Sequence, residues 1–454
     1  MAQTIAALST ASGGAIGIVR ISGERAEAYL SALFTPIGNR VLQPRMLTYG
    51  TLTINGQVID RPMAVFFPAP ATYTGEPMAE IHCHGSSAVL EGILRALFAM
   101  GARQAQPGEF TRRAFLNGKL DLFAAEAVND LVCAQSVQAA TLATAQLGGH
   151  ISSEFSDMRH RLIAMCAQFL AVIDYPDEEI EDLPLSAIHD TLEQMRKRLQ
   201  MLCDSYQRGR ALREGLPCVI VGRPNAGKST LLNALLGYDR AIVTDIAGTT
   251  RDTVEETLRL DGLILRLQDT AGLRETNDPV EQIGVGRAKD AVTMAKEDGV
   301  VLAVFDGTQP LGAEDAIVIE QVKDAKRAVA VVNKVDLSTQ MDITMLSHQF
   351  SAVVMLSAKQ REGLDTLTKT LLELTGIHDL PQDGGLITNV RQADILSRTV
   401  QNLEQASRQL LAGFAPDAVV YEMEQAIDSL GDMTGERVQE DIIDHIFANF
   451  CVGK

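Results

Sequence analysis

Gly222-Arg-Pro-Asn-Ala-Gly-Lys-Ser229 is the stretch of this 454-residue chain that decides its central fold. It follows an apolar run, Pro217–Val221, and leads into a helical pattern over Ser229–Leu236. A strand, a loop spelled G-x-x-x-x-G-K-[ST] and a helix form the phosphate-binding loop of nucleoside triphosphatases. Its glycines let backbone N–H groups surround phosphates, Lys228 places a positive charge at the β/γ oxygens, and the Ser229 hydroxyl binds Mg²⁺.

Three shorter motifs follow, each at the end of a predicted strand. Asp269-Thr-Ala-Gly272 is placed to hold Mg²⁺ through water and to contact the γ-phosphate. In Asn333-Lys-Val-Asp336, the Asp336 carboxylate can accept from guanine N1–H and N2–H₂ together, a donor pair that adenine lacks. Ser357-Ala-Lys359 is placed to bind guanine O6 through a backbone N–H. Four motifs in this order predict a Ras-like GTPase domain.

The residues predicted to contact GTP come from five segments: Asn225, Ala226, Gly227, Lys228, Ser229 and Thr230; Thr244, Asp245, Ile246, Ala247, Gly248, Thr249 and Thr250; Asp269, Thr270, Ala271 and Gly272; Asn333, Lys334, Val335 and Asp336; Ser357, Ala358 and Lys359. Thr250 is the expected second Mg²⁺ ligand beside Ser229, and Thr249 is the competing choice.

The residue after Gly272 bears on how water is activated. A glutamine often stands there and orients the attacking water, but this chain has Leu273. Glu281 is the nearest plausible carboxylate downstream; the alternative is a solvated glutamate on a helix. No arginine in residues 244–250 fits the role of an arginine finger.

The spacing of apolar residues divides the rest of the chain into a mixed N-terminal part and two helical parts. Up to residue 118 it is mixed, with strands expected at Gly17–Ser22 and Met46–Ile54, a hairpin at Asn55-Gly56, and a helix over Val89–Met100. Helical spacing then dominates on both sides of the GTPase motifs. These helical positions are Leu162, Cys166, Phe169 and Ile173; Leu192, Met195, Leu199 and Leu202; Leu396, Val400, Leu403 and Leu410; and Val438, Ile442, Ile446 and Phe450.

The predicted fold class is therefore multidomain, α/β plus all-α. It comprises an N-terminal α+β domain (1–118), a discontinuous helical domain (119–212 and 380–454) and a GTPase domain inserted into it (213–379).

Composition excludes several classes of protein. Apolar residues make up 46% and charged residues 22%, which is ordinary for a globular chain. The net charge of −18 argues against a non-specific nucleic-acid binder, although residues 1–118 hold nine Arg against seven acids. No apolar run is long enough to cross a membrane, and six cysteines without a C-x-x-C pair fit a reducing cytosol. We expect a cytoplasmic protein.

Two further groups of residues have open interpretations. Cys451, Gly453 and Lys454 lie in the last four residues, and the tail is a functional site, a frayed end, or a segment whose thiol is only buried. A prenylation signal does not fit, because the sequence ends Gly-Lys. His82 and His84 lie on one strand face, but zinc would need two more ligands nearby.

These motifs together resemble one family over the whole chain, the tRNA modification GTPases called TrmE or MnmE. Besides the GTPase motifs, the resemblance rests on six stretches: Tyr73-Thr-Gly-Glu76, His84-Gly85, Pro107-Gly-Glu-Phe110, Arg113-Ala-Phe-Leu-Asn117, Lys119-Leu-Asp-Leu122 and Phe450-Cys-Val-Gly-Lys454. It implies GTP-driven modification of the tRNA wobble uridine at C5, of the carboxymethylaminomethyl or aminomethyl type. An FAD-dependent partner of the MnmG or GidA type would join a homodimer in a heterotetramer or larger complex.

The resemblance also implies ligands. The N-terminal domain would bind 5-formyl-tetrahydrofolate or a related folate, through Arg20, Glu80, Lys119 and Lys454. Matching potassium ligands are Asn225, Thr244, Ile246 and Thr249, and K⁺ would do the work of the missing arginine finger. Glu281 matches a water-orienting glutamate. Cys451 would be a residue of the modification site.

Two other functions compete with this one. A ribosome-assembly GTPase would carry a basic RNA-binding module, but Gly14-Ala-Ile-Gly17 leads into a strand and lacks basic helices. A septin-like structural GTPase would need heptads or a lipid-anchoring stretch, and the sequence has neither.

Overall fold

The computed structural model describes most of the chain. The described residues are 3–11, 13–39, 41–174, 185–238, 256–267, 293, 295–377, 381, 383–438, 440–448 and 450–453. The chain forms two compact units, residues 1–132, 143–196 and 398–454, and residues 133–142 and 197–397. The domain boundaries expected from sequence, at 118, 212 and 379, stay a prediction.

The first unit begins with a curved sheet in the order β3-β4-β6-β7-β2-β1-β8, with β5 paired to β4. All pairings are antiparallel except that of β1 with β8. The strands are β1 (Ile5–Leu8), β2 (Ile16–Ser22), β3 (Phe34–Pro36), β4 (Thr48–Ile54), β5 (Gln57–Asp60), β6 (Met63–Phe67), β7 (Met78–His84) and β8 (Arg103–Gln104). Asn55 and Gly56 both have positive φ between β4 and β5, which confirms the predicted hairpin.

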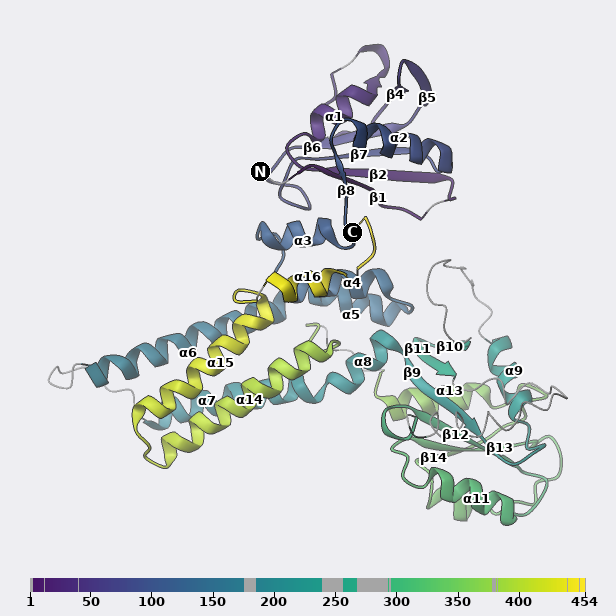
Figure 1. The fold of residues 1–454 in the computed structure, drawn as a ribbon. Coiled ribbons are helices and arrows are strands. Elements are labelled where there is room, and N and C mark those ends of the chain that lie inside the picture. Colours follow the sequence, from purple (N-terminus) through teal and green to yellow (C-terminus); the bar gives the residue numbers. More distant parts are fainter. Residues whose placement is uncertain are drawn as a thin grey trace. The chain divides into compact units, whose positions relative to one another are not determined.

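Two helices cover one face of this sheet, α1 (Ala26–Leu33) and α2 (Ser87–Ala99) (Figure 1). Alternate residues of β2, such as Val19 and Ile21, pack against Leu30 and Leu97 in one apolar cluster. A single helical turn, η1 (Ile37–Asn39), follows β3. The mixed α+β expectation for this part is confirmed.

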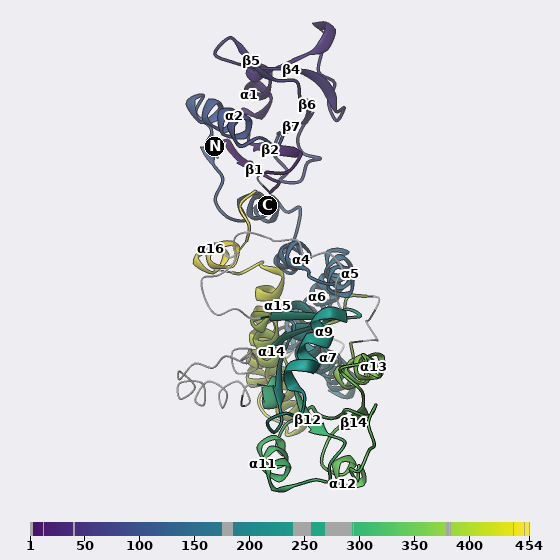
Figure 2. The same cartoon turned by 90° about the vertical axis from the view of Figure 1, so that its right-hand side faces the viewer.

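The helices that follow are α3 (Glu109–Leu116), α4 (Leu122–Cys133), α5 (Val137–Leu147), α6 (His150–Asp174), α7 (Leu185–Asp204), α8 (Tyr206–Glu214), α14 (Val390–Leu411), α15 (Pro416–Thr434) and α16 (Glu440–Ala448). Helix α15 lies beside α6, as both views show (Figures 1 and 2). The apolar stripe predicted for α7 is buried at all four positions. In α6, Leu162 and Cys166 are buried and Phe169 is half-buried, while the side chain of Ile173 lies outside the described residues.

The stripe predicted for the last helix is confirmed at Val438, Ile446 and Phe450, which pack in or against one apolar cluster, but not at Ile442. Ile442 is 47% exposed, whereas Ile443 and Phe447 are buried against Leu122 and Phe115 of the preceding helices. Spacing of four residues is shared by neighbouring stripes of a helix, so only the packing partner decides which stripe is buried.

The second unit holds a sheet in the order β10-β11-β9-β12-β13-β14, parallel except for β10. The strands are β9 (Leu216–Val221), β10 (Glu256–Leu260), β11 (Leu263–Leu267), β12 (Val300–Asp306), β13 (Ala328–Asn333) and β14 (Ala352–Met355). Helices α9 (Lys228–Tyr238), α11 (Ala313–Val322), α12 (Thr344–Ser347) and α13 (Leu364–Thr375) accompany them.

Strand β12 shows why its sequence is continuously apolar. Leu302 and Val304 belong to a core shared with α9 and α13, whereas Ala303 and Phe305 belong to one shared with α11. A parallel strand covered on both faces buries every side chain, so alternation with polar residues is absent. No helix among the described residues combines the length and apolar character needed to span a membrane.

Candidate functional site

The phosphate loop lies between β9 and α9, at the carboxyl end of a central strand. Gly222 and Gly227 have φ of 154° and 99°, and Asn225 takes φ of 62° without being glycine. A Cβ on Gly227 would lie 2.2 Å from Nδ2 of Asn333, and one on Gly222 would lie 2.4 Å from the carbonyl oxygen of Val304. Glycine is therefore required at both positions for the backbone conformation and for space.

The side chain of Lys228 bends back and contacts the backbone of the phosphate loop. Its Nζ donates to the carbonyl oxygens of Gly222 at 2.8 Å and Arg223 at 3.0 Å. Burial lowers the pKa of Lys228 from its usual value. Because α9 begins at Lys228, the first N–H groups of this helix, at Ser229 and Thr230, point to the place where a phosphate would bind. These positions suit the phosphate-binding role predicted for the loop.

Asn333 joins three of the predicted motifs. Its buried amide Nδ2 donates to the carbonyl oxygen of Ala226 at 3.1 Å. Its Oδ1 accepts from the backbone N–H of Lys334 at 2.8 Å and of Ala358 at 3.0 Å. The sequence predicted a nucleotide contact here; the structure places this side chain in the framework that holds the guanine-side loops to the phosphate loop.

The groups expected to read guanine are arranged beside it. Asp336 lies on an exposed turn after β13, and the backbone N–H of Val335 donates to Leu356 at 3.4 Å. Ser357 is buried and its Oγ accepts from the N–H of Gln360 at 3.2 Å, whereas Lys359 is exposed. The two loops are thus held side by side at the carboxyl ends of neighbouring parallel strands, where ligands bind in such sheets.

Several predicted site residues lie outside the described residues. They are Thr244, Asp245, Ile246, Ala247, Gly248, Thr249 and Thr250, then Asp269, Thr270, Ala271 and Gly272, and finally Glu281 and Lys454. Their roles stay predictions.

A second group of predicted residues meets in the N-terminal sheet. Arg20 of β2 and Glu80 of β7 face each other in register, with Nε donating to Oε1 at 2.9 Å. His82 Nε2 lies 3.1 Å from the other carboxylate oxygen. The Arg20 guanidinium carbon lies 5.8 Å from the ring centroid of Tyr73 and 5.6 Å from that of Phe110. An ion pair flanked by two aromatic rings suits a flat ligand that carries N–H donors and carboxylates.

The end of the chain reaches this same group. Val452 forms a β-bridge with Pro107, and the N–H of Gly108 donates to the carbonyl oxygen of Cys451 at 3.2 Å. The carbonyl oxygen of Gly453 accepts from Ser9 Oγ at 3.1 Å and lies 3.5 Å from Nη1 of Arg20. The structure thus brings together residues more than four hundred positions apart.

Gly453 allows this close approach. Its φ is 97°, and a Cβ there would lie 2.2 Å from the carbonyl oxygen of Leu8. Cys451 is exposed. Lys119 reaches the loop that carries Tyr73, because its Cε lies 3.3 Å from where a Cβ on Gly75 would stand.

The two histidines bind carboxylates on separate strands. His82 contacts Glu80, and Nδ1 of the exposed His84 lies 2.8 Å from Oδ1 of Asp60. Among the described residues, no group of three or more His, Cys, Asp or Glu could hold a metal ion.

Three features of the structure were not predicted from the sequence. Tyr73 and Phe110 lie in stretches that resemble the family, but no role was expected of them. Asp306 ends β12 and accepts from Lys334, and its position at the carboxyl end of a parallel strand is the signal that could have found it.

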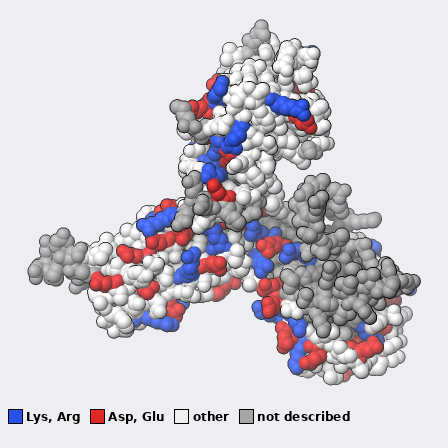
Figure 3. Space-filling model, viewed as in Figure 1, with Lys and Arg blue, Asp and Glu red and all other residues white. Residues whose placement is uncertain are grey.

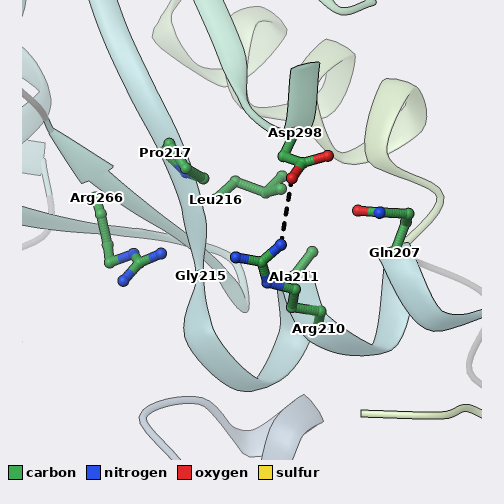
Figure 4. A pocket seen from close by; sticks show the side chains of 8 residues that line it. All are labelled: Gln207, Arg210, Ala211, Gly215, Leu216, Pro217, Arg266 and Asp298. Atoms are coloured by element: carbon green, nitrogen blue, oxygen red, sulfur yellow. Dashed lines mark hydrogen bonds and ion pairs between the residues drawn. The ribbon is translucent and has the colours of Figure 1, made fainter. Parts of the chain in front are cut away.

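The third is a small pocket where α8 leads into β9 (Figure 4). There Arg210 donates to Asp298 at 3.2 Å, just before β12.

Comparison with known proteins decides the family. The helical domain of MnmE matches residues 122–451, and the N-terminal domain of the GTP-binding protein TrmE matches residues 4–119. Proteins named tRNA modification GTPase MnmE are similar along the full chain. The chain belongs to this family.

The relatives are similar over almost their whole length. The protein of Alkaliphilus oremlandii is 38% identical and that of Roseiflexus castenholzii 41% identical, each over 100% of this chain and 99% of the relative. A crystal structure of the G domain of the FeoB iron transporter of T. maritima is 24% identical over 35% of this chain and 96% of its own, with a TM-score of 0.26. Family membership makes the chain a GTPase with a TrmE-type N-terminal domain, a helical domain and a G domain.

Proposed function

We propose that this GTPase drives modification of the wobble uridine of tRNA at C5, of the carboxymethylaminomethyl or aminomethyl type. Similarity over the full chain to tRNA modification GTPases carries the proposal, because the tail and the N-terminal domain match the family as well as the GTPase motifs do. An FAD-dependent partner of the MnmG or GidA type and tRNA complete the proposed complex. A cytoplasmic location is part of the same proposal.

The N-terminal site is proposed to take a folate, 5-formyl-tetrahydrofolate or a relative, as one-carbon source. Glu80 would accept from N–H groups of the pterin edge, and the rings beside Arg20 suit a flat heterocycle. Lys119 and Lys454 would bind its carboxylates. A bound folate would supply the one-carbon unit, and the chain's own part is to orient it and exclude water.

Cys451 is proposed to act at this site. The backbone of the tail is bound to Pro107 and Gly108, so the thiol is held on the N-terminal domain. A thiolate can add to an electrophilic carbon, which suits a residue beside a one-carbon carrier. The experiment below distinguishes a thiol that reacts from one that only lines the site.

GTP hydrolysis is proposed to depend on K⁺ and Mg²⁺. Ser229 and Thr250 would bind Mg²⁺, and Asn225, Thr244, Ile246 and Thr249 would bind K⁺, whose charge offsets that of the transition state. Glu281 would orient the attacking water. The support is the family match together with the missing glutamine at Leu273.

A homodimer is proposed through the N-terminal sheet. Neighbouring strands β4, β5 and β6 and the loop before them expose Met46, Tyr49, Val58 and Met63, each 39% exposed or more. The visible face of this domain is largely uncharged (Figure 3). Clustered apolar surface of this kind is typical of a protein interface. A heterotetramer or larger complex would form with the FAD-dependent partner, and the G domain is proposed to be an insertion in the helical domain.

One experiment tests the proposed role of the tail. A strain that lacks the gene receives either the full chain, a chain ending at Phe450, or Cys451→Ser, and its tRNA nucleosides are analysed. We expect the truncated chain to keep GTP hydrolysis and to lose C5 modification. Restored modification by the truncated chain would refute a role for the tail, and restored modification by Cys451→Ser alone would assign it a lining role.

A further inference from the structure

We propose that Asp306 is a positioning residue of the nucleotide site, which holds the phosphate loop in shape through Lys334. Asp306 belongs to none of the four GTPase motifs. It is the last residue of β12, and the phosphate loop follows the neighbouring strand β9.

Lys334 connects two loops that both face the nucleotide. Its Nζ donates to Oδ2 of Asp306 at 2.7 Å and to the carbonyl oxygen of Asn225 at 2.8 Å. One ammonium therefore bridges the end of β12 and the phosphate loop. Hydrogen bonds to a carboxylate are about twice as strong as neutral ones, so Asp306 is the anchor of this bridge.

The bridge holds a backbone conformation that is otherwise unfavourable. Asn225 has φ of 62°, in the left-handed region that residues other than glycine seldom occupy. Asparagine tolerates this region better than most residues, but the conformation persists only where surrounding contacts impose it. The bond from Lys334 fixes the direction of the Asn225 carbonyl, and with it the turn that leads to Gly227.

Asp306 is itself held rigidly. Its Oδ1 accepts from the backbone N–H of Thr308 at 3.1 Å and from Thr308 Oγ1 at 2.7 Å, and the residue is 6% exposed. Burial raises the pKa of this carboxyl, but bonds from Lys334 and Thr308 outweigh it, so the pKa lies below its usual value. The carboxylate is ionised at neutral pH, and its two bonds from Thr308 hold it in one position.

The residues that follow Asp306 also contact the phosphate loop directly. Arg223 donates from Nη2 to Oε1 of Gln309 at 3.1 Å, and its Nε lies 3.5 Å from Oδ1 of the fully buried Asp315. Residues 306–315 therefore contact the start of the loop directly, at Arg223, and hold its middle, at Asn225, through Lys334.

The test uses the full chain and a fluorescent GDP analogue, with the dissociation rate measured by stopped flow. Asp306→Asn keeps the size of the side chain and removes its charge, and we expect dissociation at least about tenfold faster. Asp324→Asn, which changes an exposed carboxylate after α11, is the matched control and should leave the rate unchanged. A rate for Asp306→Asn within twofold of the parent chain overturns the proposal.

A double-mutant cycle separates positioning from general weakening of the fold. If Asp306 acts through Lys334, adding Asp306→Asn to Lys334→Ala changes the rate by less than about twofold. If the increase in dissociation rate of the double variant equals the product of the two single increases, the two residues act independently and the proposal is overturned. The preference for GTP over XTP should stay unchanged, because Asp336 is predicted to read the base; a changed preference also counts against it.

Thr308→Val keeps the proposal testable if Asp306→Asn does not fold. It leaves both charges in place and removes one donor to Asp306, so we expect dissociation about threefold faster. An unchanged rate in a folded Thr308→Val chain overturns the proposal.

Discussion

Replacing Asn333 by alanine should weaken the binding of both GTP and GDP. The Asn333 side chain is 3% exposed and makes three hydrogen bonds, one to Ala226 and two from the N–H groups of Lys334 and Ala358. At about 1 kcal/mol net for each bond, their loss costs about 3 kcal/mol. The bonds with Ala226 and Ala358 join different loops that would bind the nucleotide, and the bond with Lys334 shapes one of these loops, so the cost should appear in affinity.

The expected change in Kd is between about tenfold and just over a hundredfold, since 1.4 kcal/mol corresponds to a factor of ten. Equilibrium titration of the full chain with fluorescent GDP and GTP analogues measures it. Gln349→Ala, on the exposed surface after α12, is the control and should leave both Kd values unchanged. A change below threefold for Asn333→Ala would show that the loops hold their arrangement without this side chain, and would refute the reasoning.

Four further predictions address other residues. Asp336→Asn should move affinity from GTP to XTP, and a chain that keeps its GTP affinity within about threefold would disprove this assignment. Asn225→Ala should abolish stimulation of GTP hydrolysis by K⁺ over Na⁺ at equal ionic strength while nucleotide still binds; equal rates of the parent chain in both salts would contradict a potassium site. Glu281→Ala should lower kcat without weakening binding, and an unchanged kcat removes it from the mechanism. Burial raises the pKa of Glu109, but two arginines and a backbone N–H lower it below its usual value, so its stabilising contribution is complete at neutral pH and is lost as pH falls through the lowered pKa. The melting temperature of Glu109→Gln should therefore fall less between pH 6 and 3 than that of the parent chain, and equal falls would exclude the ion pairs as its cause.

Local spacing was sufficient for parts of each domain. The glycines of the phosphate loop and the Asn55-Gly56 hairpin each depend on backbone conformation within a few residues. Such features are determined by residues that are close together in the sequence, so they can be predicted without knowledge of the rest of the chain. The stripe on α7 was predictable for the same reason.

Contacts between distant residues had to come from the tertiary structure. Spacing cannot show that Gly453 reaches Arg20, that Asn333 joins three motifs, or that Asp306 anchors Lys334, because each depends on the path of the chain between them. The exposure of Ile442 on α16 has the same origin. The spacing of residues within α16 suits either Ile442 or Ile443 for burial. Apolar side chains of α3 and α4 pack against Ile443, so contact with other helices decides which of the two is buried.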